Sequence, residues 1–162
     1  MPFLKAKNGQ LKKAIERDNG VDIIHTSGKS GKGIRVLVVE DNGINQLLIV
    51  KVLQKREFEI DVADNGVIAL NMLKDKDYDI ILMDLQMPEM DGYEVTRIIR
   101  NLENNKKGVP IVAMTAHTIK GERERCIEIG MDDYVPKPFN VDELFDKMFN
   151  LVKDRFDEAN IL

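Results

Sequence analysis

Cysteine and long apolar runs are almost absent from this sequence of 162 residues. The single cysteine, Cys126, excludes an intramolecular disulfide and a cysteine-rich zinc site. No apolar run approaches the roughly 20 residues that a membrane-spanning helix requires. The first ten residues include two lysines, and no long apolar stretch follows them, so no signal peptide is expected. These absences predict a soluble protein located in the cytoplasm.

The chain also lacks a strong charge of either sign. It has 24 basic and 28 acidic residues, which gives a net charge of −4. Nothing in this balance predicts bulk attraction to nucleic acid or to an anionic membrane. Apolar residues make up 43% of the chain and charged residues 32%, a mixture typical of a globular domain.

A change in composition near residue 30 indicates the domain organisation. Residues 27–33 have the sequence SGKSGKG, which is typical of a flexible linker. No function is assigned to the segment before it. The predicted division is an N-terminal arm and linker over residues 1–33, one domain over residues 34–156 and a C-terminal tail over residues 157–162.

After the linker, short apolar runs alternate with segments of helical periodicity. The run RVLVV at residues 35–39 is typical of a strand buried on both faces, whereas residues 59–63 are more polar and indicate an edge strand. The next segment has a helical stripe at Ile44, Leu47, Leu48, Val50 and Val52, with Asn42 as its N-cap. Strands are predicted at 35–39, 59–63, 80–83, 111–114 and 133–135, and helices at 43–56, 66–76, 92–103, 120–129 and 141–156.

This alternation predicts an α/β fold. The connections are short enough to demand a parallel sheet, and right-handed crossovers place helices on both faces of a doubly wound, five-stranded sheet. In such a sheet, ligands bind outside the carboxyl ends of the strands. The residues at or just after those ends are therefore the candidate site, and they are Glu40, Asp41, Asp84, Thr115 and Lys137.

The chemistry of these side chains indicates a phosphoryl site. Three neighbouring carboxylates repel one another and require raised pKa values or a bound cation, and hard oxygen ligands of this kind favour Mg²⁺. A lysine and a threonine hydroxyl suit a phosphoryl group. One carboxylate can then act as the nucleophile and become an acyl phosphate. Asp84 is the best candidate because it ends a central strand and precedes a turn restricted by Pro88 and Gly92.

Four motifs then identify a family. VVEDN at residues 38–42, MDLQMPEMDG at 83–92, MTA at 114–116 and GMDDYVPKP at 130–138 occur in order on the expected elements. With these motifs, residues 33–155 resemble the CheY-like receiver domain of two-component response regulators. The resemblance implies the flavodoxin-like strand order 2-1-3-4-5.

The resemblance also implies how the carboxylates divide their roles. Asp84 corresponds to the phosphoacceptor of the family. Asp41 corresponds to a direct Mg²⁺ ligand, and Glu40 to a ligand acting through water. Asp84 and the backbone carbonyl of Gln86 complete the protein's share of the metal shell.

The remaining motif residues correspond to the family's switch. Thr115 matches the hydroxyl that closes on the phosphoryl group, and Lys137 matches the cation that pairs with it. Tyr134 matches the aromatic residue that turns inward when the threonine moves. The resemblance also implies a cis peptide bond between Lys137 and Pro138.

The function implied is Mg²⁺-dependent transfer of a phosphoryl group to Asp84 from a phosphohistidine on a sensor histidine kinase or a histidine phosphotransfer protein. Phosphorylation would switch a protein-docking surface on the fourth helix, fifth strand and fifth helix. No turnover enzyme, direct nucleic-acid binding or membrane span is expected. Residues 114–139 most resemble receivers of hybrid histidine kinases, and both a stand-alone regulator and a part of such a kinase remain open.

Three alternatives compete with this interpretation. A degenerate receiver would act by docking without phosphorylation. A haloacid-dehalogenase-type phosphatase would have Asp-x-Asp after the first strand, where this chain has Glu40, Asp41 and Asn42. A flavodoxin-like FMN-binding protein would have a Ser/Thr/Gly-rich loop there, whereas carboxylates would repel the phosphate.

Overall fold

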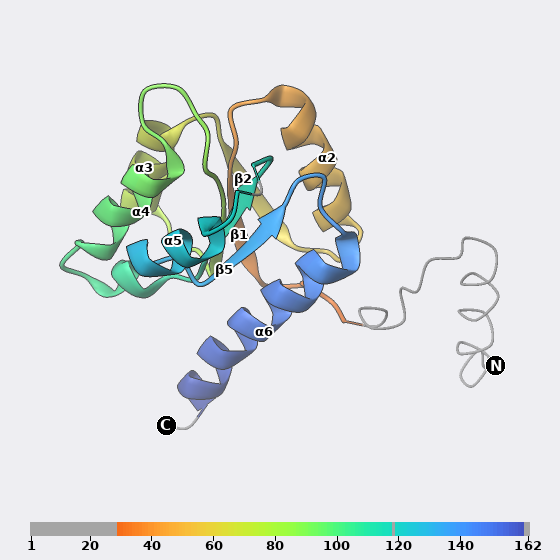
Figure 1. Ribbon diagram of the computed structural model, residues 1–162. Coiled ribbons are helices and arrows are strands. Elements are labelled where there is room, and N and C mark those ends of the chain that lie inside the picture. Colours follow the sequence, from red (N-terminus) through yellow and green to blue (C-terminus); the bar gives the residue numbers. More distant parts are fainter. Residues whose placement is uncertain (1–28, 118, 161–162) are drawn as a thin grey trace, which may run out of the picture.

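A parallel sheet of five strands, in the order β2-β1-β3-β4-β5, is the centre of the computed structural model (Figure 1). The structure describes residues 29–117 and 119–160, so the predictions for residues 1–28 lie outside the described residues. The predicted order is confirmed, and β2 is an edge strand as expected. The strands are β1 (Arg35–Val39), β2 (Glu59–Ala63), β3 (Ile80–Asp84), β4 (Ile111–Thr115) and β5 (Asp133–Pro136).

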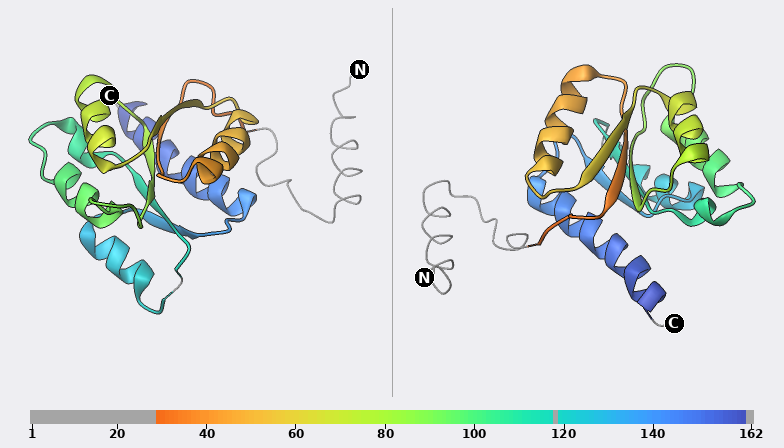
Figure 2. Two further views of the ribbon diagram at one scale, coloured as in Figure 1. Left: turned by 90° about the horizontal axis from the view of Figure 1, so that it is seen from above. Right: turned by 180° about the vertical axis from the view of Figure 1, so that it is seen from behind.

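Helices cover both faces of the sheet. Two core clusters show that α2 and α6 pack on one face and that α3, α4 and α5 pack on the other, as the view from above makes clear (Figure 2). Within the described residues, no helix combines the length and the apolar character needed to cross a membrane. The helices are α2 (Gly43–Gln54), α3 (Gly66–Asp75), α4 (Gly92–Arg100), the 3-10 helix η1 (Asn105–Gly108), α5 (Glu122–Ile129) and α6 (Val141–Asn160).

Local sequence determines where the helices begin. The Asn42 side chain accepts hydrogen bonds from the backbone amides of Ile44 and Asn45, which confirms it as the N-cap of α2. Asp91 caps α4 in the same way. The predicted ends are less accurate: α4 stops before residue 103, and α6 continues beyond residue 156 into the predicted tail.

The apolar stripe of α2 does not face the core. Ile44, Leu47 and Leu48 are 78%, 56% and 53% exposed, whereas the buried contacts of the helix come from Ile49 and Leu53. Apolar residues occur on almost every side of this helix, so their spacing predicts a helix but not its orientation. The helix therefore presents an apolar surface to solvent at the end of the molecule where β1 terminates.

The last residues of the predicted linker are packed against the domain. The Gly31 amide donates a hydrogen bond to the carbonyl of Arg56, and the Lys29 ammonium lies 5.5 Å from the centre of the Phe149 ring. A Cβ atom on Gly31 would come within 2.4 Å of the Phe58 ring, so only glycine fits this contact. Ordered packing thus begins before residue 34.

Candidate functional site

Three carboxylates meet at the carboxyl end of the sheet. Glu40 and Asp41 follow β1, and Asp84 is the last residue of β3. One oxygen atom from each side chain lies within 4.8 Å of the other two. Glu40 and Asp84 are buried and Asp41 is exposed. The convergence expected from the strand ends is therefore present.

Lys137 supplies the positive charge beside them. It follows β5, and its Nζ atom lies 2.7 Å from Glu40 Oε1 and 3.4 Å from Asp84 Oδ1. Its side chain is only 16% exposed, so these ion pairs are screened less than surface pairs. One ammonium cannot neutralise three carboxylates, which leaves the site with excess negative charge. The Lys137–Pro138 peptide bond is cis, as expected.

Glu40 is held by hydrogen bonds that the sequence reasoning did not predict. Its carboxylate accepts hydrogen bonds from the Asn42 backbone amide at 3.1 Å and from Asn45 Nδ2 at 3.3 Å. Its backbone carbonyl accepts a hydrogen bond from Gln46 Nε2 at 2.6 Å. The only sequence signal for Asn45 and Gln46 is their position on the first turn of the helix that follows the acidic pair.

Asp41 is the unsatisfied member of the group. Within residues 29–117 and 119–160, its carboxylate makes no hydrogen bond and no ion pair. An exposed carboxylate next to two buried ones forms a set of hard oxygen donors that fits Mg²⁺. Of the two buried carboxylates Glu40 is the more closely engaged, because Lys137 Nζ lies 2.7 Å from Glu40 Oε1 and 3.4 Å from Asp84 Oδ1.

Burial makes the Asp84 carboxylate more basic. Loss of solvation raises the pKa of its carboxyl group to about 6, and the negative charge of Glu40 acts in the same direction. The Gln86 backbone amide, which donates a hydrogen bond to Asp84 Oδ1 at 3.1 Å, and Lys137 oppose this rise in pKa. Near pH 7 the group is therefore mainly ionised, more basic than an ordinary aspartate, and able to act as a nucleophile.

Gly92 allows α4 to begin directly behind Asp84. A Cβ atom on Gly92 would lie 2.4 Å from the Asp84 carbonyl oxygen and 3.0 Å from the Cα atom of Leu85. The Gly92 amide also donates a hydrogen bond to the Leu85 carbonyl at 3.1 Å, which closes the turn after β3. The glycine therefore fixes the backbone that presents the carboxylate.

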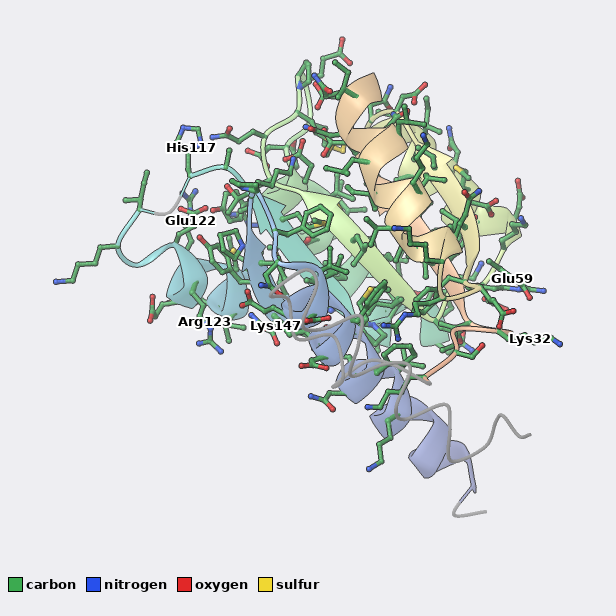
Figure 3. The ribbon with its side chains drawn as sticks, turned by 90° about the vertical axis from the view of Figure 1, so that its right-hand side faces the viewer. Lys32, Glu59, His117, Glu122, Arg123 and Lys147 are labelled. Carbon is green, nitrogen blue, oxygen red and sulfur yellow. The ribbon has the colours of Figure 1, made fainter. Side chains whose placement is uncertain are left out.

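The two predicted switch residues are linked through one backbone segment. Thr115 ends β4 and is buried, and its Oγ1 atom accepts a hydrogen bond from the His117 amide at 3.0 Å. The Tyr134 hydroxyl donates a hydrogen bond to the His117 carbonyl at 3.3 Å. His117 lies at the end of the molecule opposite Lys32 and Glu59 (Figure 3). Its main chain, which the sequence reasoning did not place in the switch, joins Thr115 to Tyr134.

A cleft of about 290 Å³ opens beside Lys137. It lies between α2 and the connection from β5 to α6, and Leu48, an exposed apolar residue of α2, forms part of its lining. A bound protein could therefore reach the carboxylates across an apolar surface. The cleft is lined by Asn45, Leu48, Ile49, Ala116, Lys137, Pro138 and Phe139.

Comparison with known sequences gives a family. Residues 36–149 match the family model of the response regulator receiver domain. The chain is 42% identical over 151 residues to hybrid signal transduction histidine kinase I of Dictyostelium discoideum, covering 90% of this chain and 9% of that protein. It is 41% identical over 117 residues to sensor histidine kinase GacS of Pseudomonas protegens, covering 71% of this chain and 13% of that protein.

Solved structures agree with the sequence relatives. The receiver domain of sensor histidine kinase PA1611 from Pseudomonas aeruginosa, with magnesium coordinated in its active-site cleft, has a TM-score of 0.69 and 39% identity over 75% of this chain and 98% of that one. The Saccharomyces cerevisiae complex of the phosphotransfer protein Ypd1 with the Ssk1 receiver domain gives a TM-score of 0.69 and 31% identity, over 78% and 94%. The chain therefore belongs to the response regulator receiver family and is a receiver domain of two-component phosphorelay signalling.

Proposed function

We propose that Asp84 accepts a phosphoryl group and becomes an acyl phosphate. One observation supports this assignment above all: a buried, mainly ionised carboxylate ends β3 with two further carboxylates and a lysine around it. The Asp84 oxygen attacks the donor's phosphorus while the phosphorus–nitrogen bond to the donor's imidazole breaks and leaves its electron pair on nitrogen.

The residues fit Mg²⁺ as the resident cofactor. Asp41, Asp84 and the backbone carbonyl of Gln86 would hold it, with Glu40 contributing through water. When bound, Mg²⁺ supplies the positive charge that offsets the repulsion between the carboxylates and the incoming phosphoryl group. The magnesium in the cleft of the related P. aeruginosa receiver supports this assignment.

The chain's own residues would then complete the switch. Lys137 is close enough to Asp84 Oδ1, at 3.4 Å, to pair with the new phosphoryl group. For Thr115 to donate its hydroxyl to a phosphoryl oxygen, the hydroxyl must give up the hydrogen bond that it donates to the His117 carbonyl at 3.4 Å. That exchange shifts the His117 main chain and, through the hydrogen bond from Tyr134, the edge of β5. We expect the altered docking surface on α5, β5 and α6, and a signalling role without turnover.

The proposed donor is a phosphohistidine on a sensor histidine kinase or a histidine phosphotransfer protein. The relatives support this class of partner, because the matched sequences include histidine kinases and one structural neighbour is bound to a phosphotransfer protein. The exposed side chains of Ile44, Leu47 and Leu48 on α2, of which Leu48 lines the cleft, provide an apolar contact surface for the donor. Such a contact would bring an imidazole to the carboxylates from the side of α2.

Phosphorylation of Asp84 can be tested by mass. The wild-type chain, incubated with Mg²⁺ and acetyl phosphate, is expected to gain one phosphate, about 80 Da, that hydroxylamine removes as it does other acyl phosphates. Asp84→Asn should gain none. Asp91→Asn is the matched control, because asparagine also caps α4. A gain on Asp84→Asn would contradict the assignment, and no gain on the wild type would favour a receiver that acts by docking alone.

The donor surface needs a separate test. Ile44→Ser with Leu48→Ser should slow phosphorylation by a phosphorylated histidine phosphotransfer domain and leave phosphorylation by acetyl phosphate unchanged, because only the protein donor uses the surface. Val67→Ser is the control, since Val67 is a similarly exposed apolar residue on α3. Equal slowing with both donors would show damage to the site rather than loss of docking.

A further inference from the structure

We propose that Gln46 is a positioning residue for the metal-binding end of β1, and that it acts by fixing the main chain from which Asp41 extends. This inference rests on the proposed magnesium site and adds to it a residue with no carboxylate of its own. Gln46 lies on the first turn of α2, half-buried, and none of the four receiver motifs includes it.

The Gln46 side chain joins two strand ends. Its Nε2 atom donates hydrogen bonds to the Glu40 carbonyl at 2.6 Å and to Asp64 Oδ1 at 2.7 Å. Glu40 immediately follows β1, and its amide donates to the Ala63 carbonyl at the end of β2. The side-chain amide of Gln46 therefore ties the backbone at the end of β1 to Asp64 in the loop that follows β2.

The contact is made to the atom that most directly determines how Asp41 is presented. A peptide unit is planar, and the Glu40 carbonyl lies in the same plane as the Cα atom of Asp41. Holding that carbonyl fixes the plane and limits the directions in which the Asp41 side chain can extend. The Asp41 carboxylate has no partner of its own within the described residues, so its orientation depends on the backbone.

Gln46 and its neighbour Asn45 hold different parts of Glu40. Asn45 Nδ2 donates to the Glu40 carboxylate, whereas Gln46 donates to the Glu40 main chain. Neither side chain is needed to start α2, because Asn42 already caps it. A ligand oriented in advance binds a metal more tightly than one that must be ordered during binding. The expected effect of removing Gln46 is therefore on metal affinity rather than on the fold.

The test is a calorimetric titration of the full chain with Mg²⁺, comparing wild type with Gln46→Leu. Leucine has a similar size but donates nothing, so the Mg²⁺ dissociation constant should rise about tenfold. Gln54→Leu is the matched control, an exposed glutamine on the same helix, and should leave the constant unchanged. Asp64→Ala removes the anchor but keeps Gln46, and should raise the constant by a smaller factor that disappears when Gln46→Leu is also present.

A kinetic measurement separates positioning from general damage. In phosphorylation by acetyl phosphate, Gln46→Leu should raise the Mg²⁺ concentration for half-maximal rate by the same factor, while the rate at saturating Mg²⁺ equals that of wild type. Wild-type Mg²⁺ affinity in Gln46→Leu, an equal loss in Gln54→Leu, or a lower saturating rate with unchanged affinity would each overturn the inference. If the wild type itself bound no Mg²⁺, the proposed metal site would fail, and this inference with it.

Discussion

The charged side chains at the two ends of the sheet differ strongly in how many partners they have. At the amino end, Arg100 pairs with Asp132, and at the carboxyl end Asp41 has no partner among the described residues. Lys106 at the amino end likewise donates to the Leu73 carbonyl, where α3 finishes. Arg100 also donates hydrogen bonds to three backbone carbonyls, those of Gly130, Lys107 and Val109.

This difference separates residues that stabilise the domain from residues that we propose perform its chemistry. A half-buried cation with a full set of acceptors, such as Arg100, contributes to stability, and removing it leaves those acceptors unpaired. Carboxylates that repel one another cost stability, a cost that the proposed magnesium site would explain. The amino end is therefore expected to lose stability on mutation, whereas the carboxyl end is expected to gain it.

The largest expected change in stability comes from a substitution at the amino end of the sheet. Arg100→Met should lower the free energy of unfolding by about 3 kcal/mol, since four acceptors, including the Asp132 carboxylate, lose their donor. Urea unfolding measures this change. Arg97→Met is the control, because Arg97 is exposed on the same helix, and it should change stability by less than about 0.5 kcal/mol. Similar losses in both variants would contradict the comparison.

Replacing Asp84 is expected to raise the free energy of unfolding rather than lower it. Its folded-state pKa is about 6, above its ordinary value of 3.8, so the folded protein binds more protons than the unfolded chain between about pH 4 and pH 6. Stability contributed by this group therefore falls as pH rises through that window. Asp84→Asn should raise the free energy of unfolding by about 2 kcal/mol at pH 7.5, with the gain declining toward zero near pH 4. A gain independent of pH would exclude titration of Asp84 as its cause.

Bound magnesium should offset the repulsion between the three carboxylates at the carboxyl end of the sheet. At ten times its dissociation constant, Mg²⁺ is expected to stabilise the wild type by about 1.4 kcal/mol, because it binds the folded state alone. Asp41→Asn should lose most of this effect, whereas Asp75→Asn, at an exposed carboxylate on α3, should keep it. Thermal unfolding with and without the metal measures the difference. Equal stabilisation of the two variants would place the metal elsewhere.

The smallest expected changes in stability come from replacing two tyrosines, Tyr78 and Tyr134, by phenylalanine. The Tyr78 hydroxyl donates to Asp61 Oδ2 at 2.6 Å, and burial together with this carboxylate raises the pKa of Tyr78. Tyr78→Phe should cost about 1 kcal/mol of stability without affecting phosphorylation. Tyr134→Phe, which removes the hydrogen bond to the His117 carbonyl, should cost less than about 0.5 kcal/mol. A larger stability loss from Tyr134→Phe would reverse this assignment.

Residues whose position follows from the end of a strand were predictable from the sequence. Asp84, Thr115 and Lys137 each end or follow an apolar run, and parallel strands bring those positions to one edge. The order of the strands came from the resemblance, since the alternation of strands and helices alone allows several orders. The terminal glycine of the turn after β3 was recognised, but its 2.4 Å approach to the Asp84 carbonyl required coordinates.

Residues that act across elements were not predictable. Gln46 bonds to Asp64 and Arg100 bonds to Asp132, and neither partner lies at a spacing that a local pattern could reveal. The orientation of α2 was also inaccessible, because its apolar residues surround the helix and only packing selects Ile49 and Leu53 for burial. Long-range polar partners and the choice of a buried face are tertiary properties, and a single sequence contains neither.

The packing of residues 29–31 determines how the domain should respond to mechanical tension. Gly31 is hydrogen-bonded to Arg56, and Lys29 lies over the Phe149 ring, so a pull applied at Lys29 first loads the α2–β2 turn and α6. β1 has hydrogen-bonded neighbours on both sides and must be sheared from two strands at once. The short entry segment should therefore peel away first under force. Asp84, at the far end of the sheet, would keep its geometry until β1 itself yields.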